Sequence, residues 1–161
     1  MEIPDVLTHL LVGVSIALLV QKDGPQSRQM LIVLGAALID IERPISWLLA
    51  NSSLYWIELG YAFHSILGAV ILSFFGASCF ELESSIFLDR FKLILLGCVS
   101  HLLLDMVMYP WAELGLQLLY PLKIQFSFNL LWSDVWVYPA FGGIAFGIAL
   151  LIRYMMDRNP E

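Results

Sequence analysis

Charged residues are scarce in this sequence. Of its 161 residues, Asp, Glu, Lys and Arg together make up only 14%, whereas hydrophobic residues make up 60%. Soluble domains average about a quarter charged and about half apolar residues. The shortage of charge therefore argues against a soluble globular domain and favours an integral membrane protein, whose solvent is hydrocarbon.

Basic residues and cysteines are also few. Eight Lys and Arg stand against fourteen Asp and Glu, which gives a net charge of −6, so no nucleic-acid partner is expected. Cys79 and Cys98 define neither a disulfide framework nor a zinc knuckle and are interpreted as small buried hydrophobes. Glu2 and Asp5 replace the positive start of a cleavable signal peptide, so the first apolar stretch is expected to stay as a helix.

Long apolar runs organise the rest of the chain. They cover about Val6–Val20, Met30–Ala50, Tyr61–Phe80, Phe91–Met108 and Trp136–Met156. Pro44 is expected to kink or end the second run. Residues 111–134 are amphipathic and aromatic-rich, which is typical of an interfacial or re-entrant segment. The sequence thus predicts one all-α domain over residues 1–161, a polytopic membrane protein of about five transmembrane helices surrounded by membrane lipids.

The orientation follows from the basic residues in the short loops. Six of the eight fall at the same ends of the predicted spans: Lys22, Arg28, Arg90, Lys92, Arg153 and Arg158. Cytoplasmic loops carry the excess of Lys and Arg. We therefore expect an inner (plasma) membrane protein with its N-terminus outside and its C-terminus in the cytoplasm.

Five ionisable side chains lie inside or at the ends of these apolar runs: His9, Asp40, His64, His101 and Asp105. At a helical rise of ~1.5 Å per residue, His9, Asp40 and Asp105 lie roughly 18–20 Å from the nearest inner basic residue. His101 lies one turn further inward and His64 begins the third run from outside. All five reach a similar level in the outer half of the bilayer, which a shared site explains with one assumption.

The chemistry of this set favours a divalent metal ion. His101 and Asp105 are four residues apart and share a helix face, so both can ligate one ion. Three imidazoles and two carboxylates suit Zn²⁺ or a similar ion, which would offset the cost of burying the carboxylates. An open coordination position would lower the pKa of a bound water, the ordinary route to metal-assisted hydrolysis. The alternative is that these groups only hydrogen-bond between helices.

Four further residues are candidates near such a site. Glu42 could support a ligand, ligate the metal, or pair with Arg43. Asp5, four residues before His9, is interpreted as a helix-start residue or as a group that supports His9. Arg43 and Lys123 are the basic residues expected on the outer half and are candidate contacts for a substrate phosphate. The competing interpretations are the Glu42 pair for Arg43 and interfacial snorkelling for Lys123.

Several of these residues fall in short motifs that resemble one family, the membrane-bound metal-dependent hydrolases, also called LexA-binding, inner-membrane-associated hydrolases. The similar segments are Thr8-His9-Leu10 with Gly13, residues 35–42 (GAALIDIE), His64-Ser65, residues 100–105 (SHLLLD) and residues 118–121 (LLYP). They occur in the family's order over about three-quarters of the chain. The SHLLLD block with the downstream LLYP is the most specific part. Ile39 and Glu42 replace the family's proline and second aspartate, and residues 59–63 lack its His-Arg-Gly-x-Thr.

The resemblance implies a chemistry because this family is distantly similar to zinc-dependent phospholipase C and single-strand zinc nucleases. It implies that His64, His101 and Asp105 hold one metal, and that Asp105 bridges to a second ion near His9. Asp40 would be a ligand or the general base. No histidines remain for a third site, so about one or two zinc ions are expected.

These observations together predict a membrane-embedded, zinc-type hydrolase of a phosphoester, such as a lipid or isoprenoid phosphate, at the level of the outer leaflet. A different class remains open: a small ion transporter or a non-catalytic metal-binding membrane protein, because buried His and Asp also mark ion pathways. The inner halves of the spans are largely apolar, which favours a one-sided pocket over a path.

Overall fold

The structure, a computed structural model, describes residues 3–21, 24–48, 59–80, 84–107, 116–126, 128 and 137–158. Over these residues the chain is helical, apart from turns and one isolated β-bridge, which confirms the predicted all-α class. The main elements are α1 (Ile3–Val20), α2 (Gln26–Leu38), the 3₁₀ turn η1 (Ile39–Ile41), α3 (Glu42–Leu48), α5 (Ile66–Ser78), α6 (Ser84–Val107) and α7 (Val137–Arg158).

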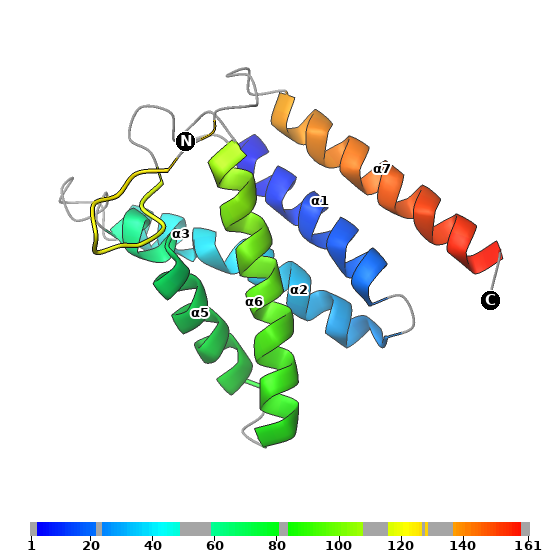
Figure 1. Cartoon of the computed structure of the whole chain (residues 1–161), viewed down its shortest axis with the longest axis horizontal. Helices are drawn as coiled ribbons and strands as arrows, with labels where there is room; N and C mark the ends of the chain where they lie inside the picture. Colours follow the sequence, from blue (N-terminus) through cyan, green and yellow to red (C-terminus); the bar gives the residue numbers. More distant parts are fainter. Residues whose placement is uncertain are drawn as a thin grey trace.

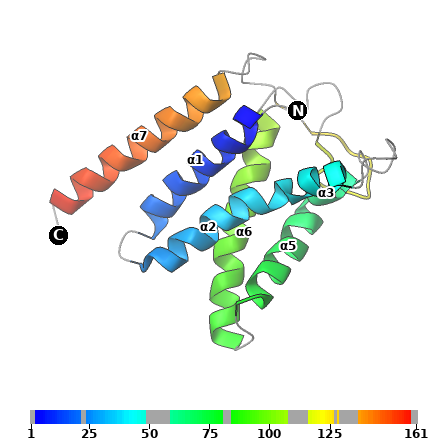
Figure 2. The ribbon, with the colours of Figure 1, turned by 180° about the vertical axis from the view of Figure 1, so that it is seen from behind.

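Helix α2 lies at the centre of the arrangement (Figures 1 and 2). It packs against both α1 and α6, while α5 packs on α6 and α7 packs on α1. The best-buried apolar side chains, Ile32, Ile39 and Ile94, come from α2, η1 and α6. The core therefore sits where α2 and α6 cross, and α7 lies on the far side of α1.

Two glycines allow α2 and α6 to approach with their backbones in contact. A Cβ atom on Gly35 would clash with the carbonyl oxygen of Ile94, and one on Gly97 would clash with the carbonyl oxygen of Ile32. At the same crossing the Cys98 thiol contacts the Gly35 carbonyl oxygen at 3.3 Å. Small residues at such positions are how membrane helices pack closely. Cys98 is buried, as its apolar surroundings in the sequence predict, whereas Cys79 is exposed.

The second apolar run is interrupted before Pro44. Regular α-helix ends at Leu38, the 3₁₀ turn follows, and α3 begins at Glu42. Proline cannot donate to the carbonyl four residues earlier and its ring crowds that carbonyl, which here belongs to Asp40. The break therefore falls at Asp40, one turn upstream of the proline that causes it.

The number of membrane spans remains a prediction. Among the described helices, α7 is long and apolar enough to cross a bilayer, while residues Val6–Val20 and helix α5 are apolar but shorter. Helix α6 has 24 residues, but its first turns carry Asp89, Arg90 and Lys92. The structure thus confirms the helical class without fixing five spans.

The described part of the predicted interfacial segment is a loop rather than a helix. Leu116 and Phe126 pair across its base, and the Leu118 carbonyl accepts a hydrogen bond of 2.9 Å from the Ile66 amide at the start of α5. Leu116 is buried, whereas Leu122 and Ile124 near the tip are exposed. The loop is therefore fixed to the helices at one end and presents apolar side chains at the other.

Candidate metal centre

All five ionisable residues predicted for the site lie close together. His9 comes from α1, Asp40 from η1, His64 from the turn before α5, and His101 and Asp105 from α6. Each of the five is at most 6% exposed. Four separate parts of the chain therefore contribute ionisable side chains to one buried region, as the matched depths predict.

The backbone orients two of the histidines. Nδ1 of His101 lies 2.6 Å from the Ala36 carbonyl oxygen on α2, and Nδ1 of His64 lies 3.0 Å from the Gly60 carbonyl oxygen. A carbonyl oxygen can only accept, so each Nδ1 carries the proton and donates. Nε2 of each ring is then left with its lone pair, which is the form that ligates a metal.

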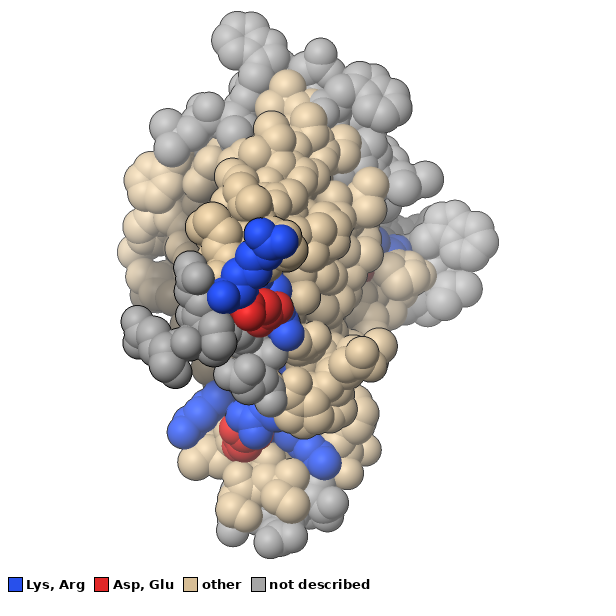
Figure 3. All heavy atoms as spheres, turned by 90° about the vertical axis from the view of Figure 1, so that its right-hand side faces the viewer, with Lys and Arg blue, Asp and Glu red and all other residues tan. Residues whose placement is uncertain are grey.

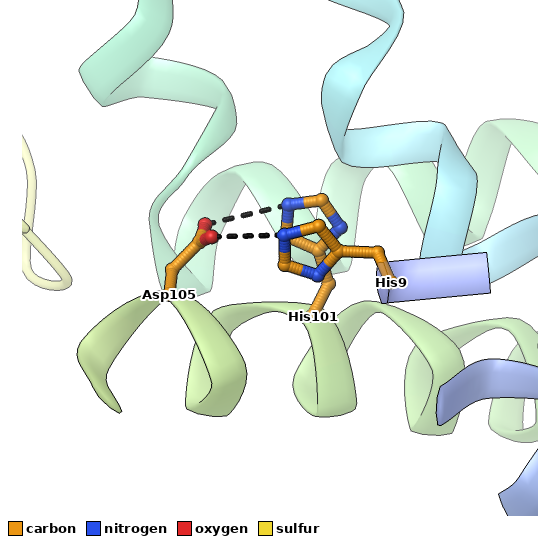
Figure 4. A group of neighbouring side chains, drawn as sticks. All are labelled: His9, His101 and Asp105. Carbon is orange, nitrogen blue, oxygen red and sulfur yellow. Dashed lines mark ion pairs between the residues drawn. The ribbon is translucent and has the colours of Figure 1, made fainter. Parts of the chain in front are cut away.

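The carboxylate of Asp105 is the centre of the cluster (Figure 4). Its Oδ1 lies 3.1 Å from Nε2 of His9, and its Oδ2 lies 3.3 Å from Nε2 of His101 and 3.6 Å from Nε2 of His64. The rings of His9 and His101 stack with centroids 3.6 Å apart, and both face this carboxylate. One oxygen of the Asp105 carboxylate thus faces His9, and the other faces His64 and His101.

Asp40 completes a second group on the other side of His64 and His101. Its Oδ1 lies 3.6 Å from Nε2 of His64 and 3.9 Å from Nε2 of His101. Two sets of ligand atoms are compact enough for a metal ion, one from His9, His101 and Asp105 and the other from Asp40, His64 and His101. Because His101 belongs to both sets, the two groups are neighbours.

The distances between these ligand atoms fit tetrahedral coordination of a metal ion. Two ligands at ~2.0–2.1 Å from Zn²⁺ with a tetrahedral angle between them are roughly 3.3 Å apart, which is close to the shorter distances around Asp105. Nε2 of His101 and Oδ2 of Asp105 are 3.3 Å apart, yet both are buried without a hydrogen bond to any described residue. Buried polar atoms of that kind are costly unless something else satisfies them. The two groups could therefore hold a metal ion.

Arg43 makes a contact that the sequence interpretation missed. The Arg43 Nε lies 3.9 Å from the Glu42 carboxylate, which is the ion pair that one interpretation predicted, and it lies closer, at 2.8 Å, to Oδ1 of Asp40. The i, i+3 spacing of Asp40 and Arg43 was the signal in the sequence. Arg43 therefore acts on a candidate ligand directly, and its side chain is 17% exposed.

The other candidate residues are placed less directly. Lys123 is exposed on the 116–126 loop, and it forms no hydrogen bond or ion pair with the five central side chains in the described part of the chain. The side chain of Asp5 lies outside the described residues.

Ser65, beside His64, caps α5: its Oγ accepts from the Gly68 amide at 2.9 Å and donates to the Ala62 carbonyl at 2.7 Å. Ser65 thus fixes the backbone that presents His64.

Comparison with known proteins gives one family. A family profile described as "YdjM inner membrane protein" matches residues 5–159. No curated protein and no solved structure matches the chain.

Proposed function

The chain belongs to the YdjM inner membrane protein family and is an inner-membrane protein, and from that premise we propose that it is a membrane-embedded, metal-dependent hydrolase of phosphoesters. The observation that carries the proposal is that three histidines and two aspartates, all buried, form two neighbouring groups that share His101. Ionisable groups inside a membrane protein are costly and mark functional sites by default.

In this proposal each side chain has a separate task. His64, His101 and Oδ2 of Asp105 would hold one zinc-type ion, with Asp40 beside them. His9 faces Oδ1 of Asp105, so this carboxylate can bridge to a second ion. A bound divalent ion supplies Lewis-acid chemistry. Asp40 accepts the proton of the attacking water as general base, and Arg43 fixes the orientation of that carboxylate through its 2.8 Å contact.

The proposed substrate class is a lipid or isoprenoid phosphate in the outer leaflet. Arg43 is the cation that touches the cluster and keeps some exposure to its surroundings. Guanidinium groups bind phosphate oxygens through charge-assisted, often bidentate hydrogen bonds. Lys123, exposed on a loop with apolar neighbours, is suited to the interface where headgroups lie.

Hydrolysis tests the proposal. Zinc- or manganese-loaded protein in liposomes is expected to release phosphate, or a phosphorylated headgroup, from lipid phosphates. Asp40→Asn should reduce the rate by roughly 10²–10⁴-fold because the general base is lost. Asp157→Asn, the same change at an exposed position on α7, should leave the rate unchanged. No turnover in protein that carries about one or two ions per chain would rule out the hydrolase and leave a metal-binding protein.

The alternative function, a metal-binding protein without hydrolase activity, is supported by the burial of the site. All five side chains are almost fully buried, and Arg43 occupies one side of Asp40. A closed site of this kind suits a metal with a structural role, since catalytic sites keep an open position. An ion transporter is less suited, because residues 16–20, 30–34 and 71–75, which lie towards the proposed inner side, are mainly apolar.

We also propose five spans with the N-terminus outside and the C-terminus in the cytoplasm, so that the site lies towards the outer leaflet. In Figure 1 the start of α1, the end of α6 and the start of α7 lie at one end of the molecule. The α1–α2 turn, the α5–α6 connection and the end of α7 lie towards the other. Successive spans then alternate in direction, with α2, η1 and α3 counted as one broken span.

The orientation has a direct test. A green fluorescent protein fused after the last residue should fluoresce, and an alkaline phosphatase fused there should be inactive, because the basic residues place this end in the cytoplasm. The reverse pattern would contradict the proposed orientation and move the cluster to the inner half of the bilayer.

A further inference from the structure

Two adjoining cavities, which none of the five residues of the metal centre lines, extend from the region of the α1–α2 turn. One, of about 710 Å³, runs between α1 and α2 and is lined mostly by apolar side chains such as Val14, Leu18 and Leu34. The other, of about 510 Å³, lies between the starts of α2 and α6 and includes Arg28 and Arg90. They share Ser27, Leu31 and Phe80. A polar hollow thus continues into an apolar groove.

Among the described residues that line the polar cavity, Arg90 is the cation with no carboxylate partner. Both Nη atoms of Arg28 lie 2.8 Å from the carboxylate of Asp89, and its Nε donates to Gln21 Oε1 at 2.9 Å, so Arg28 is neutralised. The guanidinium of Arg90 lies over the Phe80 ring at 5.9 Å. Nη1 of Arg90 is buried without a hydrogen bond to any residue in the described ranges. A buried guanidinium nitrogen without a hydrogen bond is costly, and an anionic oxygen would satisfy it.

The apolar cavity has the length of a lipid tail. Its lining on α2 extends from Gln26 to Ala37, a separation of eleven residues, or roughly 16 Å of helix. That is about half of the ~30 Å hydrocarbon core of a bilayer, the depth of one leaflet. The polar end of the groove lies where the chain's basic residues gather, which Figure 3 shows as two groups on the side of the α1–α2 turn and the end of α7.

We propose that these cavities form a binding site for an anionic phospholipid of the inner leaflet. The lipid phosphate accepts from Arg90, and one acyl chain occupies the groove between α1 and α2. Charge complementarity selects this occupant over a zwitterionic lipid, since a basic group at the cytoplasmic surface attracts anionic headgroups. The site shares no residue with the histidine–aspartate cluster and does not depend on hydrolase activity.

Lipid titration of the detergent-solubilised full chain, followed by native mass spectrometry, tests the site. Phosphatidylglycerol should bind more tightly than phosphatidylcholine with the same chains. Arg90→Gln should weaken phosphatidylglycerol binding roughly fivefold or more. Lys92→Gln removes the same charge two residues along α6 from an exposed side chain that lines neither cavity, and should bind like the unmodified chain. Equal losses in the two variants would mean diffuse charge attraction and overturn the proposal.

A second variant tests the groove itself. Val14→Trp fills the apolar cavity, so it should weaken long-chain phosphatidylglycerol at least as much as Arg90→Gln, while the thermal unfolding midpoint of each variant shows that it is folded. Inorganic phosphate should not displace the lipid, because it has no acyl chain. Displacement by phosphate at equal affinity, or unchanged binding in Val14→Trp, would show a free-anion site instead and overturn the lipid assignment.

Discussion

Asp105→Asn is expected to abolish metal binding by the protein. The oxygens of this one carboxylate lie within 3.6 Å of the Nε2 atoms of all three histidines. Asparagine keeps the shape of the side chain but loses the charge that would balance a divalent ion. Loss of a group that merely supports a ligand costs about 10–100-fold in affinity, so loss of the shared ligand should cost a hundredfold or more.

The measurement is the metal content of detergent-purified protein by inductively coupled plasma mass spectrometry, after loading with zinc and washing. The unmodified chain should retain about one or two ions, and Asp105→Asn almost none. Asp89→Asn is the matched control, because it makes the same change on the same helix at a half-exposed ion pair with Arg28. Equal metal content in Asp105→Asn and the control, or none in the unmodified chain after reloading, would overturn the metal site.

Gly97→Ala is expected to cause a large loss of stability for the addition of a single methyl group. The added Cβ would meet the carbonyl oxygen of Ile32, the amide nitrogen of Ala36 and the carbonyl carbon of Gly35, all of them backbone atoms that cannot rotate away. Helices α2 and α6 must then separate. Overpacking of this kind typically costs about 1–3 kcal/mol, which lowers the thermal midpoint of a chain this size by roughly 2–12 °C.

The same substitution should weaken the metal site. His101 lies one turn after Gly97 on α6, and its Nδ1 donates to the Ala36 carbonyl across the crossing. Separation of the helices breaks that 2.6 Å hydrogen bond and frees the ring. Gly143→Ala is the control, because the described structure places no atom near a Cβ there. If both variants unfold at the same temperature, the close crossing of α2 and α6 is wrong.

A large part of the site could be predicted from the sequence because of two regularities. The rise of an α-helix is constant, so the depths of His9, Asp40 and Asp105 can be counted from the basic residues at the ends of the runs. The i, i+4 spacing puts His101 and Asp105 on one helix face before any packing is known. The scarcity of charge in the apolar runs made these few residues conspicuous.

Rotation about each helix axis could not be predicted in the same way. It depends on how neighbouring helices cross, and the crossing here depends on Gly35 and Gly97, which carry no pattern of their own in the sequence. The contact of Arg43 with Asp40 was not predicted, for a related reason. The chain between Asp40 and Arg43 begins in a 3₁₀ turn and passes into α3, and this geometry brings Asp40 closer than Glu42 to the Arg43 Nε.

The sequence by itself determined that this is a helical membrane chain and which ionisable residues fall within its apolar runs, because composition and helical periodicity are local properties. Only the tertiary structure decided that Asp105 is shared by three imidazoles and that backbone carbonyls of Ala36 and Gly60 orient two of them. It also decided that a charged hollow joins an apolar groove between α1, α2 and α6. These features arise from contacts between segments far apart in the chain, which local patterns do not encode.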